Sequence, residues 1–373
     1  MRRRGDRRSC GPALAAAAGG DRLEFEHSAR GARWDGSHPL RSRRRYVRQV
    51  HHVEIKRRMG ESDIAAISLL LEAASIADGH RALGEHQWLD LVQGGREGFA
   101  GFVARESGRE RVIAYAQISR GNGRNWAVEY VVHPQWRSAG VELQEDLLRA
   151  ALGEIAEQGG GHVHMWVPKP GPINDAVAAA VGLRRGRDLV QMRRELPVTE
   201  QSAAMSVRPF RTGEDELAWL EVNNRAFRDH PEQGSWDLAT ITEREHQPWF
   251  DPRGFLLHER DGRLAGFCWT KVHEPENDLM NEVLMHHLGE IYVIAVDPDF
   301  QGHGLGRQLV LAGLASLSER GVSTGMLYVD HDNEAARNLY FSLGFIDDHT
   351  DRAYVTDVPA GGAGEAPGPG RRK

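Results

Sequence analysis

The chain has 373 residues, enough for two ordinary domains, and 40% of them are hydrophobic. No stretch approaches the roughly 18 consecutive apolar residues of a membrane helix, and two cysteines, Cys10 and Cys268, are too few for a disulfide framework or a zinc site. The net charge is −6, although residues 1–58 alone carry sixteen Lys and Arg against six Asp and Glu, so the remaining chain is strongly acidic, which argues against a nucleic-acid-binding body.

Residues 1–58 show neither a helical nor a strand period. We predict a disordered basic extension, or sequence upstream of the true start, because Met59 immediately precedes the first well-patterned segment. A basic arm that binds nucleic acid is the alternative interpretation.

Two later stretches, residues 128–152 and 289–314, repeat one layout. In each, a β-branched run ends at a proline, Pro134 or Pro298, and a polar turn with glycine leads into an amphipathic helix. Proline ends the strand because it cannot donate to the ladder. Similar strands and helices flank both stretches, which indicates two α/β (α+β) domains with mixed sheets. We predict an N-terminal domain over 59–197, a C-terminal domain over 206–358 and a disordered tail over 359–373.

The turn of the second stretch crowds Gly302, Gly304 and Gly306 at a strand-to-helix junction. Glycines at the start of a helix expose backbone N–H groups, and the positive helix end attracts anions. The segment lacks the Gly-Lys-Ser/Thr of a P-loop and the spacing of the dinucleotide fingerprint. It predicts a phosphate cradle, with a plain tight turn as the alternative.

The pattern Gln301-x-x-Gly304-x-Gly306, followed by "NEAARNLYFSLGF" over 333–345, resembles the GNAT superfamily of N-acetyltransferases. The resemblance implies two tandem GNAT domains, acetyl-CoA as co-substrate and no metal. In the second half it implies backbone pairing with pantetheine at Ile294, Ala295 and Val296, a pyrophosphate cradle at Gln301, Gly302, His303, Gly304, Leu305, Gly306 and Arg307, and further cofactor contacts at Asn333, Glu334, Ala335, Ala336, Arg337 and Asn338. In the first half it implies cofactor contacts at Tyr130, Val131 and Val132.

Acetyl transfer to an amine requires a group that takes a proton from the ammonium and an acid for the leaving thiolate. Glu290 begins the strand that leads to the glycine turn, and we interpret it as the base or as an anchor for the ammonium. Tyr340 lies on the last helix of the motif, where the resemblance implies the acid. A solvated carboxylate and a core aromatic are the respective alternatives.

Within the superfamily, segments such as "NNRAFRDHPEQGSW" and "LGEIYVIAVDP" resemble a tandem branch that acetylates the cysteine amine of cysteinyl-glucosaminyl-inositol. This resemblance implies substrate contacts at Glu85, Glu232, Lys271, Glu290 and Tyr328. Ordinary helix, loop and strand positions are the alternatives for these residues. We expect a cytoplasmic monomer without nucleic-acid or membrane partners.

The first half departs from the motif. It has Arg137, then Gly140, then Glu142 where the second half has Gln301, Gly304 and Gly306, and its last helix has no tyrosine. A carboxylate in the cradle repels pyrophosphate, so we predict a catalytically silent domain. The segment 274–288 is longer than expected and could alter substrate choice. The rival functions are acetyl transfer to another amine, small molecule or protein N-terminus, and a non-catalytic acyl-CoA sensor.

Overall fold

The computed structural model describes residues 51–93, 97–121, 123–139, 141–198, 205–228, 233–273 and 288–361. Contacts divide the chain into two units. Arg187–Asp351 form the C-terminal unit, and the described residues up to Gly186, with those from Arg352 on, form the N-terminal unit. Within these described ranges, no helix is both long and apolar enough to span a membrane.

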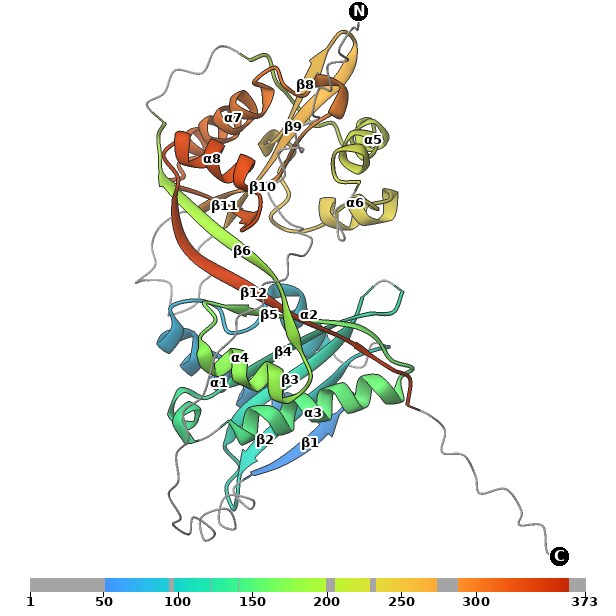
Figure 1. The fold of residues 1–373 in the computed structure, drawn as a ribbon, viewed down its shortest axis with the longest axis vertical. Helices are drawn as coiled ribbons and strands as arrows, with labels where there is room; N and C mark the ends of the chain where they lie inside the picture. Colours follow the sequence, from blue (N-terminus) through green and yellow to red (C-terminus); the bar gives the residue numbers. More distant parts are fainter. Residues whose placement is uncertain are drawn as a thin grey trace, which may run out of the picture. The chain divides into compact units, whose positions relative to one another are not determined.

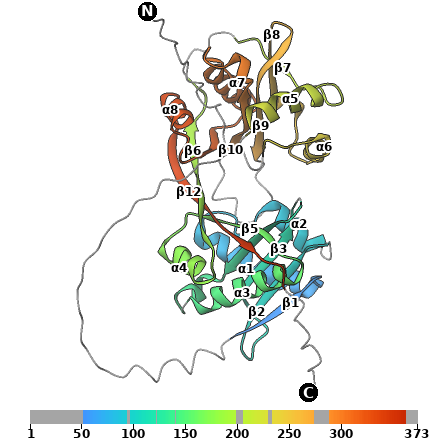
Figure 2. The same cartoon turned by 45° about the vertical axis from the view of Figure 1, so that its right-hand side comes forward.

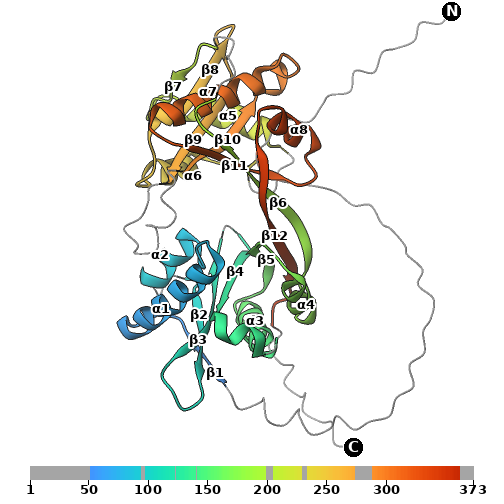
Figure 3. The ribbon, with the colours of Figure 1, turned by 90° about the vertical axis from the view of Figure 1, so that its left-hand side faces the viewer.

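The N-terminal unit is an antiparallel meander of four strands, β1 to β4, followed by β5, which runs parallel to β4. Helices α1 and α2 lie on one side of these strands, and α3 and α4 on the other (Figure 3). The elements are β1 (His51–Lys56), α1 (Glu61–Asp78), α2 (Glu85–Gln93), β2 (Ala100–Glu106), β3 (Val112–Arg120), β4 (Asn125–Val132), α3 (Glu142–Glu157), β5 (Gly161–Pro168) and α4 (Pro172–Ala180).

The prediction of a disordered extension over residues 1–58 is wrong for its last part, because His51–Lys56 form strand β1 and pair with β2. The segment is short and mostly polar, so its strand character comes from pairing with β2, which a local pattern does not reveal. Two ion pairs hold the end of β1 and the residue after it. Lys56 pairs with Asp63 at 2.8 Å, and Arg57 pairs with the buried Glu154 at 2.6 Å. The prediction for residues 1–50 lies outside the described residues.

The C-terminal unit has a mixed sheet in the order β12-β6-β11-β10-β9-β8-β7. Helices α7 and α8 pack on one face, and α5 and α6 pack on the other over β8, β9 and β10 (Figure 1). The elements are β6 (Arg184–Glu195), β7 (Arg208–Pro209), α5 (Glu216–Ala226), α6 (Leu238–Glu245), β8 (Phe255–Arg260), β9 (Arg263–His273), β10 (Leu288–Val296), α7 (Leu305–Glu319), β11 (Thr324–Asp330), α8 (Glu334–Ser342) and β12 (Ile346–Val358).

Strands β6 and β12 each run through both units, side by side (Figure 2). The residues of β6 from Arg187 on pair with β11 in the C-terminal unit. The residues of β12 from Arg352 on belong to the N-terminal unit, in which β12 lies beside β5. The units therefore divide the chain at other residues than the predicted boundaries, 59–197 and 206–358.

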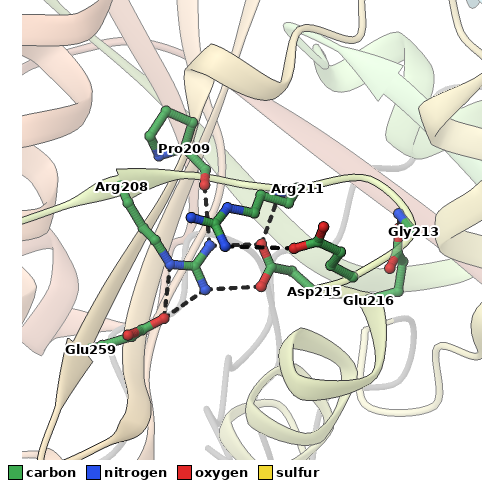
Figure 4. A network of polar contacts seen from close by, with 8 residues as sticks. Arg208, Pro209, Arg211, Gly213, Asp215, Glu216 and Glu259 are labelled. Atoms are coloured by element: carbon green, nitrogen blue, oxygen red, sulfur yellow. Dashed lines mark hydrogen bonds and ion pairs between the residues drawn. The ribbon is translucent and has the colours of Figure 1, made fainter.

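A polar network fixes the start of α5 (Figure 4). Arg208 makes two hydrogen bonds to Asp215, at 2.7 and 2.8 Å, and an ion pair with Glu259 of β8 at 2.6 Å. The Asp215 carboxylate also accepts the backbone N–H of Arg211 at 2.7 Å. The hydrogen bonds from Arg208 lower the pKa of Asp215. The network ties α5 to the sheet, and the last turn of α5 carries Arg225.

We predict that Asp175→Asn destabilises the N-terminal unit, by on the order of 1 kcal/mol at neutral pH. Hydrogen bonds from Arg185, Tyr354 and Arg352 lower the pKa of Asp175 to about 2. This stabilisation is present above the ordinary carboxylate pKa of about 4 and is lost as the pH falls through 2. Thermal unfolding should therefore separate variant and wild type at pH 7, and less at pH 3.

Asp357→Asn is the matched control, because Asp357 lies on β12 with Arg352 and Tyr354, has 76% of its side chain exposed and pairs with His162. We expect little change from it. An Asp175→Asn effect no larger than that of the control, or one that grows toward acid pH, would contradict the assignment.

Candidate active site

The sheet of the C-terminal unit splits between β10 and β11. These parallel strands pair only over Leu288–Glu290 and Thr324–Met326, although β10 continues to Val296. On its other edge, β10 stays paired with β9 as far as Val296. The segment after Glu290 therefore presents a strand edge that β11 does not cover, and Ile294, Ala295 and Val296 lie on this edge. Their buried side chains leave the backbone as the part that a ligand meets.

A β-bulge at Tyr292 lies beside this split, where the register of β10 against β9 shifts between Ile291 and Val293. Ile291 packs with α7 and α8, whereas Val293 and Ala295 pack with α5 and α6. The bulge therefore changes which residues face each layer, and Glu290 and Tyr292 share the face of Val293. No local sequence pattern indicates this bulge, because it depends on the register of two strands.

Two side chains, those of Asp297 and Gln301, fix the segment that leads from β10 into the glycine turn. Buried Asp297 accepts the backbone N–H of Asp299 at 2.9 Å and pairs with Arg225 of α5 at 3.0 Å. The Gln301 side chain donates to the Val296 carbonyl at 3.3 Å. These contacts set the direction in which the chain leaves β10.

Gly302 and Gly304 have φ of 81° and 74°, a left-handed conformation that favours glycine, and a Cβ on either would point into open space. Gly302, His303 and Gly304 are exposed, and α7 begins at Leu305. The first turn of a helix leaves its N–H groups without intrahelical partners, so this turn can hold an anion. Leu305 and Gly306 are buried in that turn, and Arg307 donates to Ser342 of α8 at 2.9 Å.

The predicted cofactor residues of α8 divide by exposure. Asn333 caps the helix by accepting the N–H of Ala336 at 3.1 Å, and Arg337 pairs with Asp347 at 2.8 Å. Ala336 is buried in the core, whereas the side chains that remain at the surface are those of Glu334, Ala335 and Asn338.

Tyr340 is fully buried in the core between the sheet and α7 and α8, together with Ile294 and Val296 of β10. Its hydroxyl has no hydrogen-bond partner within the described part of the chain. Burial raises the pKa of Tyr340, so the phenol keeps its proton at neutral pH. A buried donor without a partner is costly to a fold, which suits a group that meets a ligand.

Three predicted substrate residues share the sheet face opposite α7 and α8. Their strand neighbours Ile291 and Leu327 point to the α7 and α8 core, so Glu290 and Tyr328 point away from it. Lys271 lies opposite Glu290 in the register, and its ammonium is 4.5 Å from the Trp249 ring centroid. Of the other two predicted residues, Glu232 lies outside the described residues, and Glu85 begins α2 in the N-terminal unit.

Two partners on this face were missed by the sequence reasoning. The His273 imidazole lies 2.8 Å from a Glu290 carboxylate oxygen, and Gln191 of β6 donates to the Tyr328 hydroxyl at 2.7 Å. His273 ends the same apolar strand as Lys271, and that position beside a candidate base is the signal that could have found it. Gln191 lies 137 residues from Tyr328, so no local pattern reveals it.

The N-terminal unit repeats the split. β4 and β5 pair only over Asn125–Ala127, and a cavity of about 620 Å³ lies next to them, lined in part by Tyr130, Val131 and Val132. Arg137 donates to the Val132 carbonyl at 3.0 Å, as Gln301 does to Val296. The two loops are therefore built on the same frame.

The N-terminal unit differs from the C-terminal unit in the segment that follows β4. Arg137 also makes a two-pronged ion pair with Asp78, with its shorter contact at 2.5 Å. The register of β3 and β4 runs without a bulge. Glu142 begins α3, and Gly140 lies outside the described residues. Arg137, the counterpart of Gln301, is thus held in a charged pair with Asp78 in the lining of the cavity.

A split parallel pair, a glycine turn at a helix start and a buried tyrosine beside them define the class of acyl-CoA-dependent N-acyltransferases. No cluster of three or more His, Cys, Asp or Glu residues suited to a metal occurs among the described residues. The model of the acetyltransferase (GNAT) family matches residues 218–345.

Relatives named mycothiol acetyltransferase match along most of the chain. That of Acidimicrobium ferrooxidans is 40% identical over 80% of this chain and 95% of its own length, and that of Thermobispora bispora is 44% identical over 79% and 95%. The relative from Streptomyces coelicolor is 39% identical over 80% and 93%. The chain belongs to the mycothiol acetyltransferase family.

Solved structures show the same fold at lower identity. A GCN5-related N-acetyltransferase from Sphaerobacter thermophilus has a TM-score of 0.63 at 23% identity and covers 83% of this chain and 96% of that one. A tandem GNAT protein from the clavulanic acid biosynthesis pathway has a TM-score of 0.60 at 18% identity, with coverages of 82% and 99%. The predicted fold of two tandem GNAT domains is confirmed.

We predict that Tyr340→Phe leaves stability unchanged or raises it by up to about 1 kcal/mol, because the lost hydroxyl has no partner in the described structure. Tyr354→Phe is the matched control, since that buried hydroxyl donates to Asp175 at 2.8 Å, and its loss should cost about 1 kcal/mol. Denaturant unfolding of both variants measures the difference. Equal destabilisation of the two variants would indicate that the Tyr340 hydroxyl has a hydrogen-bond partner after all.

Proposed function

We propose that the protein transfers the acetyl group of acetyl-CoA to the cysteine amine of cysteinyl-glucosaminyl-inositol, which gives mycothiol. The observation that carries the proposal is the combination, in one unit, of the open β10 edge, the glycine turn, Glu290 and Tyr340. Relatives at about 40% identity over nearly their full length support the same reaction.

The residues present fit acetyl-CoA as the co-substrate. The uncovered edge of Ile294–Val296 can exchange hydrogen bonds with the amides of the pantetheine arm, as a neighbouring strand would. The left-handed turn at Gly302 and Gly304 leaves room for pyrophosphate oxygens against the N–H groups from Gln301 to Arg307. The start of α8, from Asn333 to Asn338, would complete this binding site.

The acceptor amine arrives as an ammonium, which must lose a proton before it can attack the thioester. We assign the acceptance of this proton to Glu290, whose side chain is 13% exposed. Attack forms the carbon–nitrogen bond, and collapse of the tetrahedral species breaks the carbon–sulfur bond. We assign the protonation of the thiolate to Tyr340, because its buried phenol is neutral and has no other partner among the described residues. The second proton lost by the nitrogen leaves to solvent. Exchange with solvent then removes the proton from Glu290 and returns one to the Tyr340 phenolate, so that one proton is released per turnover.

We place the acceptor on the sheet face that carries Lys271, Glu290 and Tyr328. Hydroxyl groups of a sugar and a cyclitol need hydrogen-bonding side chains, which this face supplies. Glu232 and Glu85 remain proposed contacts on the resemblance alone. We propose that the N-terminal unit is catalytically silent, with Tyr130, Val131 and Val132 as its cofactor contacts.

We predict that Glu290→Gln lowers kcat by on the order of 10²- to 10⁴-fold while leaving the Kd of acetyl-CoA nearly unchanged. The amide keeps the size of the carboxylate but cannot take a proton. Steady-state kinetics and calorimetry measure the two quantities. Unchanged turnover would show that another group removes the proton.

We predict that Gly304→Val weakens acetyl-CoA binding at least about tenfold, because valine is strained at a positive φ and its side chain fills the cradle. Gly321→Val is the matched control: Gly321 has a φ of 81°, open space at its Cβ, and lies after the other end of α7. The control should lose stability without losing affinity. Equal affinities of the two variants would place the phosphates elsewhere.

A further inference from the structure

The sheet face that carries Lys271, Glu290 and Tyr328, here called the acceptor face, contains a polar contact to Glu290 that has no role so far in the proposed reaction. The Nε2 atom of His273 lies 2.8 Å from Oε2 of Glu290, within hydrogen-bonding distance. His273 ends β9 and Glu290 lies near the start of β10, so the contact joins adjacent antiparallel strands. The imidazole side chain is 34% exposed and the Glu290 side chain is 13% exposed.

A carboxylate oxygen only accepts hydrogen bonds, so the imidazole must donate from Nε2. This contact fixes which ring nitrogen carries the hydrogen and how the carboxylate is rotated. With Oε2 occupied by the imidazole, Oε1 is left to face the incoming amine.

We propose that His273 is a positioning residue for Glu290, which orients the carboxylate toward the acceptor amine through the bond from Nε2 to Oε2. The inference rests on the proposed function for its catalytic consequence, whereas the hydrogen bond itself can be tested without turnover.

Other titratable groups around Glu290 do not replace this contact. Lys271 of β9 lies opposite Glu290 in the register and stacks on Trp249. Tyr292 of β10 accepts a hydrogen bond from Arg244 of α6 at 3.2 Å. The Tyr328 hydroxyl of β11 accepts one from Gln191. Burial raises the pKa of both tyrosines, so they stay neutral, and the His273 imidazole lies within hydrogen-bonding distance of the Glu290 carboxylate.

The kinetic test compares two substitutions. His273→Leu removes the donor at similar size, and we expect it to lower kcat/KM for the acceptor by about 10- to 100-fold. His273→Gln retains an N–H donor and should recover most of the rate. Both should bind acetyl-CoA as the wild type does. His258→Leu is the control, because His258 is a histidine of β8 that contacts the Ser206 carbonyl, and we expect it to keep full activity.

A wild-type rate in His273→Leu would overturn the proposal. So would equal losses of rate in the Leu and Gln variants, since that result describes packing alone. If the wild-type chain acetylates no acceptor, the proposed function fails while the hydrogen bond remains open to a direct measurement.

That measurement is the ¹⁵N chemical shift of the His273 ring nitrogens. In the wild type we expect the Nε2-protonated tautomer, and in Glu290→Ala a return toward the mixture of free imidazole. An Nδ1-protonated ring, or shifts that do not respond to Glu290→Ala, would overturn the pairing whatever the enzyme acetylates.

Discussion

The candidate site depends on one break in backbone pairing. Strands β10 and β11 are bonded over three residues each and then separate, while β9 keeps β10 in place along its whole length. A strand edge inside a protein normally finds a partner, because unpaired backbone groups are costly. An edge that the fold leaves open at this place is therefore suited to a ligand with peptide-like amides, and the glycine turn continues directly from it.

Side-chain contacts and a bulge hold β10 and the turn after it in this arrangement. The Arg208 network fixes α5, α5 brings Arg225 to Asp297, and Asp297 holds the turn that follows β10. On the sheet face that α5 also covers, the bulge at Tyr292 places Glu290 on the same side as Val293, while the residues beyond it still pack in the core. Backbone geometry thus sets both the cofactor edge and the direction of the candidate base.

The two units show how a common frame diverges. Arg137 and Gln301 hold equivalent carbonyls at the ends of β4 and β10, so the two loops leave their strands in the same way. In the N-terminal unit the arginine is committed to Asp78 and the bulge is absent from the β3–β4 register. The committed arginine and the missing bulge support a silent role for this unit. Glu129 also lines the cavity of this unit; burial raises its pKa to about 7, and it accepts a hydrogen bond from the backbone of Gly84.

The parts of the site that the sequence could predict are those set by local backbone chemistry. Glycine at Gly302 and Gly304 reports a left-handed turn, and the Asp-Pro and His-Pro pairs report the ends of two strands. The parts it could not predict depend on residues far apart in the chain. The bulge at Tyr292 requires a partner strand, and the Arg137–Asp78 pair spans 59 residues. β12, which begins at Ile346, lies beside β5, which ends at Pro168. Strand β1 acquires its strand character only from β2.

The central claim is that this chain acetylates one particular amine. The most direct test incubates the purified full chain with acetyl-CoA and cysteinyl-glucosaminyl-inositol, with aminoglycosides and a peptide N-terminus as competing acceptors, and identifies the products by mass spectrometry. We predict a single acetyl group on the cysteine nitrogen of cysteinyl-glucosaminyl-inositol and none on the competitors. Acetylation of a competitor instead, or bound acetyl-CoA with no product at all, would contradict the account.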